Sequence, residues 1–252
     1  WASRVGGIVL PTGSVRFVAK GRIEELPGYN EGEWWVQDVA ASLPARLLGD
    51  VRGKVIADLC AAPGGKTAQL AHAGAKVWAV DISEKRLIRL RANLKRLKLE
   101  AEVVAADCLQ WMPPEPLDAI LLDAPCSATG TLRRNADIPY LKNLLDVGEL
   151  ADLQRKMLGH ALDILKPGGT LVYCTCSLEP SEGAAQITNV LSERSDVDLG
   201  PVRAEEIANR ADWIDDGAIR TLPHYLQFSE PDLSGMDGFY IARLVKREGS
   251  VG

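Results

Sequence analysis

The sequence predicts an α/β protein built on an open, mostly parallel sheet that is doubly wound, with helices on both faces. Three observations support this fold class. From residue 51 onward, short apolar runs alternate with amphipathic segments, and most of the apolar runs stop at a polar residue. The 252 residues are 46% hydrophobic and 25% charged, which is enough for one large core with a small addition.

Short apolar runs bounded by turn residues predict the strands. Such runs are typical of parallel strands, which are buried on both faces. The second of them ends at Asp81 and the fourth at Asp123. The expected strands span residues 55–59, 77–80, 102–105, 119–122, 171–176 and 239–245.

Amphipathic segments between these runs predict the helices. Leu87, Leu90 and Leu94 recur at helical spacing and form one apolar stripe. A later helix is expected to end before Pro167-Gly168-Gly169, because such a sequence stops helices. The expected helices cover residues 84–98, 149–165 and 181–193, with a shorter one through residues 68–70.

The first 49 residues differ from the rest and predict a small β-containing extension, followed by a main domain over residues 50–252. Two short strands are expected at 14–18 and 34–36, and a helix at 37–48. Basic residues interleaved with aromatic ones suit stacking on single-stranded bases, although the aromatic side chains could equally pack on the main domain. These residues are Arg16, Lys20 and Arg22, with Phe17, Tyr29, Trp34 and Trp35.

Composition excludes several classes of protein. No apolar run approaches the roughly 20 residues that a helix needs to cross a bilayer, so no membrane partner is expected. Five cysteines in a domain of this size indicate free thiols in a reducing cytoplasm. Only three histidines and no C-x-x-C are present, so no metal site is expected. The net charge of −5 means that a polyanion would bind only at a local basic patch.

A turn of small residues, Cys60-Ala61-Ala62-Pro63-Gly64-Gly65-Lys66-Thr67, follows the first predicted strand. Small residues let a ligand approach the backbone, and the start of the next helix offers free N–H groups. Gly65-Lys66-Thr67 matches the last three positions of a P-loop, but Cys60 stands where the first glycine belongs. An NTPase therefore stays as an alternative.

Four acids end or border successive predicted strands: Asp58, Asp81, Asp107 and Asp123. Asp81 is placed to accept hydrogen bonds from a ribose diol, and Asp107 to reach an adenine amino group. A single acid at a strand end often only caps the next helix. Together, however, they favour a nucleoside that carries a cationic group, as S-adenosylmethionine does.

Two cysteines lie at the ends of the fourth and fifth predicted strands. Cys126 lies in the sequence D-A-P-C-S (123–127) and Cys176 in the sequence T-C-S (175–177). Ligands bind outside the carboxyl ends of parallel strands, so we expect both thiols at one site that performs thiol chemistry. The alternative, small apolar filler, is the interpretation that we adopt for Cys60, Cys108 and Cys174, with Cys60 contributing only its backbone to the site.

In the order and type of these motifs, the chain resembles the Sun/Fmu (RsmB-like) family of S-adenosylmethionine-dependent RNA (cytosine-5)-methyltransferases. The combination of D-A-P-C-S with T-C-S is the most specific part of the likeness. The resemblance covers nearly the whole chain and rests on Gln37-Asp38, 58–67, Asp81, Asp107, 123–127, 175–177 and Asp237-Gly238-Phe239-Tyr240.

The resemblance implies a class I methyltransferase fold, a Rossmann-like sheet of seven strands with the last one antiparallel, over residues 50–252. Because the chain starts at Trp1 rather than Met, we expect that the helical RNA-binding domain found upstream in such families is missing. The implied S-adenosylmethionine site consists of Cys60, Ala61, Ala62, Pro63, Gly64, Gly65, Lys66, Asp81, Asp107 and Asp123.

The resemblance also implies that Cys176 is the nucleophile and that Cys126 is a second thiol that helps to release the product. A thiolate that adds to C6 of cytosine makes C5 nucleophilic toward a sulfonium methyl group. Because a free cysteine titrates near ~8.5, we expect Lys66 to help lower the pKa of the thiol. We expect Asp123 to hold the cytosine edge. DNA cytosine-5 enzymes instead use the cysteine of a Pro-Cys motif, which here would be Cys126.

Arginines near the site are the expected contacts with RNA. Arg133 and Arg134 are predicted to bind phosphates, the alternative being a solvated pair. Arg86 is the residue of the basic helix that we expect to turn toward the cofactor. The target cytosine must be single-stranded or flipped out of a stack. Small-subunit ribosomal RNA is the expected substrate, with a transfer RNA enzyme or a non-catalytic RNA-binding relative as alternatives.

Three positions depart from the family pattern. Ala128 stands where glycine is usual, and Ala136 where proline is usual after the arginine pair. Gly183 stands where asparagine is common after Glu182. All three flank the predicted site, so they bear on loop geometry and on the fit of RNA rather than on the chemistry.

Overall fold

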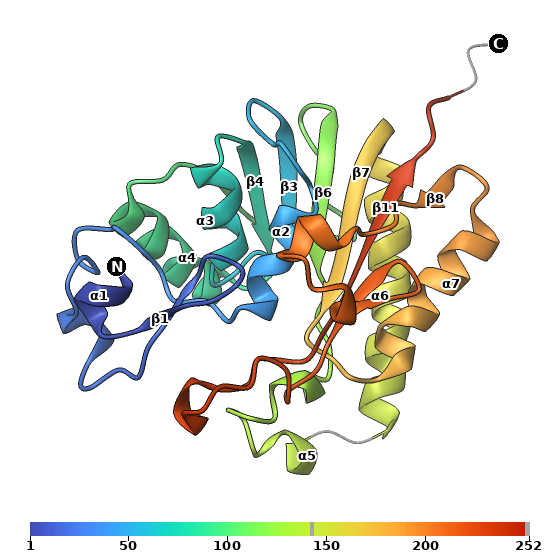
Figure 1. Ribbon diagram of the computed structural model, residues 1–252. Helices are drawn as coiled ribbons and strands as arrows, with labels where there is room; N and C mark the ends of the chain where they lie inside the picture. The colour runs from blue at the N-terminus through green and yellow to red at the C-terminus, as the bar shows by residue number, and fades with distance from the viewer. Residues whose placement is uncertain (142–143, 250–252) are drawn as a thin grey trace.

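A nine-stranded sheet forms the centre of the protein in the computed structural model, which describes residues 1–141 and 144–249 (Figure 1). The strand order is β5-β4-β3-β6-β7-β11-β10-β9, and β8 pairs with β11. Pairing is parallel from β5 to β7, whereas β11 runs antiparallel to β7. The doubly wound fold and the antiparallel last strand are therefore confirmed.

The strand count exceeds the expected seven because the sheet gains two short strands, β8 and β9. Neither is longer than three residues, which is too short to leave a pattern in the sequence. The strands of the sheet are β3 (Val55–Leu59), β4 (Lys76–Asp81), β5 (Glu102–Ala105), β6 (Leu117–Asp123), β7 (Leu165–Thr175), β8 (Val197–Leu199), β9 (Ile214–Asp215), β10 (Ala218–Thr221) and β11 (Phe239–Lys246).

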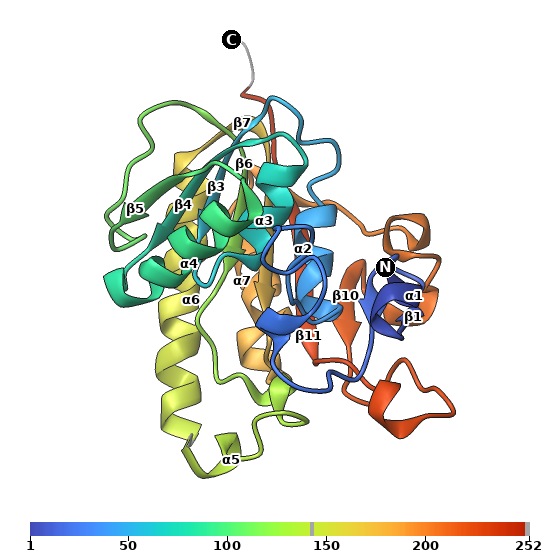
Figure 2. The same cartoon turned by 90° about the vertical axis from the view of Figure 1, so that its left-hand side faces the viewer.

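Helices cover both faces of the sheet (Figures 1 and 2). On one face, α2 and α3 pack against Ile56 and Leu121, and on the other, α6 and α7 pack against Ile120 and Leu171. α4 covers Ala79 of β4. The helices are α1 (Ala2–Val5), α2 (Leu43–Arg46), α3 (Gly65–His72), α4 (Glu84–Leu97), α5 (Ile138–Leu141), α6 (Leu144–Ile164) and α7 (Ala184–Glu193), and the 3₁₀ helices are η1 (Ile23–Glu25), η2 (Ala40–Ser42), η3 (Thr129–Thr131), η4 (Pro180–Glu182), η5 (Ala204–Ile207), η6 (Ala211–Trp213) and η7 (Pro231–Leu233). Among the described residues, none of these helices has the length and hydropathy that crossing a bilayer requires.

The strand predicted at 34–36 is wrong, because this segment has no regular structure. Trp34 instead packs on other aromatic residues of the extension, with its ring edge-on to Tyr29 at 5.4 Å and to Phe17 at 6.4 Å. The Trp35 ring lies edge-on to His72 of the main domain, at 6.3 Å. Only Val15–Arg16 of the other predicted strand is extended, as β2, and it pairs with β1 (Ile8–Val9) in a sheet of its own. An aromatic-rich segment thus gives the sequence pattern of a strand even where it has no neighbouring strand to pair with.

The helix predicted at 37–48 is shorter and broken. η2 is followed directly by α2, which has Pro44 in its first turn, where a proline needs no amide hydrogen. Leu43 and Leu47 are buried in the same core as Ile56 and Val172 of the sheet. This end of the extension therefore packs on the main sheet, and the division of the chain at residue 49 stays a prediction.

Pro167-Gly168-Gly169 lies inside β7 rather than in a turn that closes the preceding helix, although that helix ends within one residue of its predicted end. α6 runs to Ile164 and β7 begins at once, at Leu165. The pairing of β7 with β6 is irregular there: Leu117 faces Leu165, but Ala119 faces Thr170. β7 advances five residues while β6 advances two, so Pro167-Gly168-Gly169 forms a bulge at the start of the strand.

The extension is fastened to α4 through Arg96. Nη1 of Arg96 donates to the carbonyl oxygens of Tyr29 and Trp34, at 2.6 and 3.0 Å. Its guanidinium also stacks over the Tyr29 ring, 3.9 Å from the centroid. In Figure 1 the extension (blue) lies at the side of the sheet formed by β4 and α4.

Candidate active site

The parallel strands bring their carboxyl ends to one edge of the sheet. Leu59 of β3 pairs with Val80 of β4 and Leu122 of β6, and Asp123 pairs with Cys174 of β7. Because these registers are level, the polar residues that follow each strand emerge side by side. This is the edge at which open α/β sheets bind ligands.

One cavity of about 370 Å³ at this edge brings together both predicted thiols and several of the predicted cofactor-binding residues. Cys126 and Cys176 line it together with the three acids Asp81, Asp107 and Asp123. Cys60 and Arg86 contribute to the same wall. Its size falls in the range of small-molecule sites.

The two predicted thiols lie against each other in this cavity. The Sγ atoms of Cys126 and Cys176 are 3.4 Å apart, and both residues are partly exposed. The pKa of the Cys126 thiol is raised well above its ordinary value, first by its hydrogen bond with Cys176 and then by burial. Cys126 is therefore a protonated thiol near neutral pH. Cys108 and Cys174 are buried, in line with the prediction.

Lys66 and Asp123 form an ion pair beside the thiols. Nζ of Lys66 lies 2.8 Å from Oδ2 of Asp123, and Sγ of Cys174 donates to Oδ1 of the same carboxylate at 3.3 Å. Burial alone would lower the pKa of the Lys66 ammonium, but Asp123 and other nearby groups raise it by more, so the lysine stays charged. The Asp123 side chain keeps 32% of its surface exposed, which leaves it available to a ligand.

Gly64 shapes the turn of small residues. Its φ of +100° lies in the left-handed region, and a Cβ there would come within 2.9 Å of Cγ of Leu90 in α4. Cys60 also has a positive φ, of 63°, at the position where a P-loop has its first glycine. With Lys66 paired to Asp123, the turn offers no free lysine to a phosphate chain, so the NTPase alternative loses its main support.

Asp81 and Arg86 are linked across the proposed cofactor side of the cavity. Oδ2 of Asp81 accepts from the Ala62 amide at 3.1 Å and lies 3.2 Å from Nη1 of Arg86. Arg86 also donates to the Ala62 carbonyl oxygen, and Oδ1 of Asp81 accepts from the Ser83 amide at 2.9 Å. Arg86 thus turns toward the cavity, where it holds the acid at the end of β4. A carboxylate has about four acceptor positions. Asp81 uses three of them within the chain, and its side chain is only 1% exposed at the cavity wall.

Asp107 makes a local turn as well as lining the cavity. Its Oδ1 accepts from the Leu109 amide at 3.0 Å, a contact that turns the chain after β5. A capping role and a ligand role are therefore compatible for this residue.

A larger cavity of about 810 Å³ adjoins the first and shares Asp123 with it. It is lined by the turn of small residues from Ala61 to Lys66, by Tyr29 and Trp35 of the extension, and by Arg134. Aromatic and basic side chains therefore surround the opening that leads to Asp123. This lining suits a nucleic-acid strand.

Arg133 and Arg134 hold acids of two other segments. Arg134 donates to both oxygens of the fully buried Asp237, with Nη2 2.6 Å from Oδ2. Arg133 reaches Asp38 of the extension at 3.4 Å. Side-chain exposures of 40% and 54% leave each guanidinium partly open to solvent. Sequence reasoning found these arginines but not their partners, because the contacts join residues about 100 positions apart.

Glu182 is the site residue that sequence reasoning missed. It is fully buried and accepts hydrogen bonds from Ser127 and Ser177, the residues that follow the two cysteines. The only signal in the sequence is an acid six positions after Cys176, with a serine directly after each cysteine. This spacing follows neither the helix nor the strand period, so the sequence alone does not single out Glu182.

Two of the three departures from the family pattern have a local explanation. Ala128 has a φ of 60°, a conformation that suits the glycine usual there. At Gly183, a Cβ would lie 2.9 Å from Nη2 of Arg220 and 3.0 Å from the Tyr240 ring, so a side chain requires both neighbours to move. Nothing in the structure explains Ala136.

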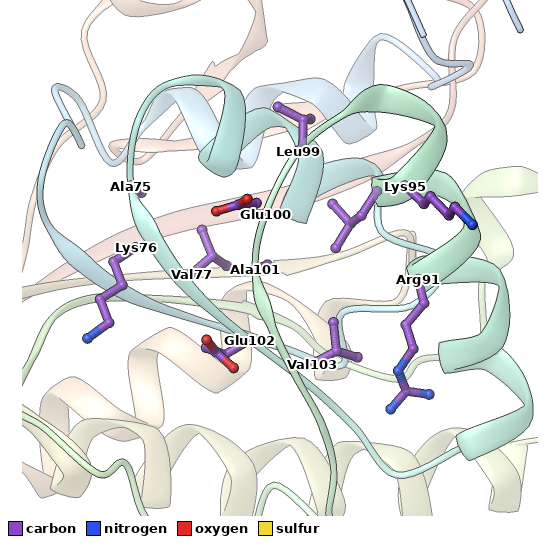
Figure 3. Close-up of a pocket in the computed structure, with 11 residues that line it drawn as sticks. Ala75, Lys76, Val77, Arg91, Lys95, Leu99, Glu100, Ala101, Glu102 and Val103 are labelled. Atoms are coloured by element: carbon purple, nitrogen blue, oxygen red, sulfur yellow. The ribbon is translucent and has the colours of Figure 1, made fainter.

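A separate hollow of about 580 Å³ lies between α4 and the strands β4 and β5 (Figure 3). Lys76 and Glu102, the first residues of β4 and β5, line it together with Arg91 and Lys95 of α4. It therefore lies toward the amino ends of the strands, and none of the predicted site residues lines it. Across the described parts of the chain, no cluster of three or more His, Cys, Asp or Glu side chains is suited to a metal ion.

Solved structures share this architecture. One described as NSun6 from Pyrococcus horikoshii with SFG has a TM-score of 0.74 and 28% identity, and covers 91% of this chain and 57% of its own. Another, described as a methyltransferase homolog protein from Pyrococcus horikoshii, has a TM-score of 0.71 and 31% identity, and covers 90% and 73%. The order and direction of the strands, together with the cavity at their carboxyl ends, identify the fold as that of the class I, Rossmann-like methyltransferases.

Sequence comparison then identifies the family. Residues 45–245 match a family described as 16S rRNA methyltransferase RsmB/F, and this chain belongs to that family. Two relatives are each named ribosomal RNA small subunit methyltransferase B. The one from Shewanella oneidensis is 43% identical over 89% of this chain, and the one from Klebsiella pneumoniae is 42% identical over 93%. The chain spans about half the length of these curated relatives, 50% and 52%.

Ala128→Gly should stabilise the protein by about 0.5–1 kcal/mol. A left-handed conformation costs a non-glycine residue about 1–2 kcal/mol, which the greater freedom of glycine in the unfolded chain partly offsets. Urea unfolding measures the difference. Ala136→Gly is the matched control, because Ala136 has no positive φ, and it should not stabilise. Equal stability of Ala128→Gly and the unmodified protein would contradict the argument.

Asp58→Asn should remove a pH dependence of stability. Burial raises the pKa of Asp58 from 3.8 to about 7, and its Oδ1 has no hydrogen-bond partner. The stability that it contributes is complete below about pH 4 and is lost as the pH rises through 7. From pH 5 to pH 8, the variant should therefore gain up to about 2–3 kcal/mol relative to the unmodified protein. Urea unfolding at both pH values checks this, and a constant difference would refute it.

Proposed function

We propose that this protein transfers a methyl group from S-adenosylmethionine to C5 of a cytosine in RNA, through a covalent bond between Cys176 and C6 of the base. The observation that carries the proposal is the single cavity that holds two thiols, 3.4 Å apart, beside acids from three strand ends. Membership of the RsmB/F family supports RNA as the substrate. The names of the curated relatives favour small-subunit ribosomal RNA.

The residues around the cavity suit S-adenosylmethionine. Asp81 offers acceptors for ribose hydroxyls, and Asp107 borders the same space. Asp123 supplies negative charge near a cation, and the turn from Cys60 to Gly65 presents small residues to a ligand. S-adenosylmethionine supplies, when bound, an electrophilic methyl group on a positively charged sulfur.

Cys176 is the proposed nucleophile. Its thiolate would form a bond to C6 of cytosine, which transfers electron density to C5 and makes that carbon able to take up a methyl group. After the C5 proton has left, the bond between sulfur and C6 breaks and the thiolate is regenerated. The raised pKa of Cys126 supports this assignment, because a protonated thiol can donate a hydrogen bond or a proton but does not attack.

Asp123 has the proposed role of holding the cytosine. It borders both cavities, so a base that enters through the larger one meets this carboxylate before the thiols. The Lys66 ammonium keeps Asp123 in place at 2.8 Å. Arg133 and Arg134 are proposed to bind phosphates with the exposed part of their guanidinium groups.

Replacement of each cysteine by alanine tests the division of labour between them. Cys176→Ala should form no covalent complex with RNA that contains 5-fluorocytosine, because the attacking sulfur is gone. Cys126→Ala should accumulate RNA bound through Cys176, because release is slowed. Denaturing electrophoresis with labelled ribosomal and transfer RNA reads both results and shows which RNA forms the covalent complex. The opposite pattern would make Cys126 the nucleophile.

Asp123→Asn should slow formation of the covalent complex by about 100-fold or more. This change leaves a buried lysine without its partner, which by itself destabilises proteins by about 3–5 kcal/mol. The double variant Lys66→Met with Asp123→Asn removes both charges, so it should be the more stable of the two and still fail to trap RNA. Thermal unfolding and adduct formation are measured together. Normal trapping by a folded double variant would disprove a role for Asp123 in holding the base.

A further inference from the structure

Glu182, at the end of η4, joins the two segments that carry the thiols. Its Oε1 accepts from the backbone amide of Ser127 at 2.9 Å. Its Oε2 accepts from the hydroxyl of Ser177 at 2.5 Å and also from the hydroxyl of Ser127. One fully buried carboxylate is therefore bonded to the residue after Cys126 and to the residue after Cys176.

The residues that precede the two cysteines are held by the same network. Nε2 of Gln154 in α6 donates to Oε1 of Glu182 at 3.1 Å and to the carbonyl oxygen of Pro125 at 2.8 Å. The Thr175 hydroxyl donates to the Glu182 carbonyl oxygen at 3.2 Å. Each cysteine thus has both of its neighbours in the chain bonded to Glu182, directly or through Gln154.

The donors around Glu182 match an ionised carboxylate. A backbone N–H and an amide N–H can only donate, and both point at Oε1. Two hydroxyl groups supply Oε2. Hydrogen bonds to a charged acceptor are shorter and stronger than neutral ones, and burial of a charge is tolerated when its lone pairs are satisfied. The carboxylate therefore makes a stiff connection between the two segments.

We infer that Glu182 is a positioning residue that clamps the segments 125–127 and 175–177 together and so fixes the separation of the Cys126 and Cys176 sulfur atoms. This inference rests on the proposed function for its catalytic meaning. Both sulfur atoms must reach the same cytosine ring, one to attack it and one to assist release. A separation of 3.4 Å places them over a single pyrimidine, and a looser pair would spend less time in that arrangement.

Hydrogen bonds that do not involve Glu182 also connect the loops that carry the two cysteines, so we expect these loops to stay folded in Glu182 variants. The Gly130 amide donates to the Cys176 carbonyl oxygen at 2.9 Å, and the Leu178 amide donates to the Thr129 hydroxyl at 2.9 Å. Glu182→Gln keeps the size of the side chain and an oxygen for the Ser127 amide, while it removes the charge. This variant is the conservative member of the test, and Glu182→Ala is the disruptive one.

The first measurement is methyl transfer to RNA and its separation into kcat and KM. Glu182→Ala should lower kcat by about 10–100-fold, the usual effect when the support of a reacting group is removed, with little change in KM for RNA. Glu182→Gln should recover part of this loss. Glu179→Gln, three positions earlier, makes the same chemical change in a side chain that forms no hydrogen bond with this network, which Glu179 contacts only through its backbone. It should therefore behave like the unmodified protein.

The second measurement reports the thiol pair without RNA or cofactor. Diamide takes up the two thiol hydrogens and converts neighbouring cysteines to a disulfide, which mass spectrometry detects as a peptide joined through Cys126 and Cys176. The unmodified protein and Glu179→Gln should cross-link at the same rate, and Glu182→Ala several-fold more slowly. Glu182→Gln should lie between them and carries the test if Glu182→Ala does not fold.

Unchanged cross-linking and unchanged kcat in the folded Glu182 variants would overturn the inference. A fall in melting temperature with equal losses in both variants, and with KM rising in parallel, would show a purely structural residue and would also overturn it. If the unmodified protein fails to trap RNA that contains 5-fluorocytosine, the proposed function is wrong, and the cross-linking rates still decide whether Glu182 positions the thiols.

Discussion

Level parallel pairing of β3, β4, β6 and β7 is the constraint on which the site depends. Each strand delivers a polar residue only to the edge where it ends, so a shift of one residue in any register would turn that residue to the other face of the sheet. The pairs Leu59 with Leu122 and Asp123 with Cys174 show that the ends are aligned. The apolar interiors of these strands, buried between α2 and α3 on one face and α6 and α7 on the other, fix that alignment.

Three ion pairs lie at this edge of the sheet, and each one fixes the position of a side chain near the cavities. Lys66 with Asp123, Arg86 with Asp81 and Arg134 with Asp237 each combine a buried or nearly buried group with a partner that orients it. Buried ion pairs contribute little to stability overall, but loss of one partner is costly, so such pairs fix geometry more than they add free energy. The three acids are therefore held at defined positions, and Asp123, with 32% of its side chain exposed, keeps acceptor positions open to a ligand.

Local sequence patterns predicted most of the helices and strands of the main domain. The features that the sequence did not predict depend on contacts between distant residues. The strands and helices from residue 55 onward have apolar periods that match their surroundings, so the fold class and the order of the motifs could be predicted. The strand predicted at 34–36 was wrong because aromatic residues favour strands only beside another strand. Here Trp34 packs on Tyr29 and Phe17, and Trp35 on His72. Within the candidate site, the motif residues could be placed at one edge from their strands alone. Glu182 and Asp237 could not, because their roles come from partners brought close only by folding.

α4 connects the amino-terminal extension with the cavity. Near its start, Arg86 is bonded to Asp81 and Ala62 beside the cavity, and near its end Arg96 grips the backbone at Tyr29 and Trp34. A helix of 14 residues is about 20 Å long and nearly rigid. One stiff helix therefore connects the amino-terminal extension with the arginine that holds Asp81 beside the cavity.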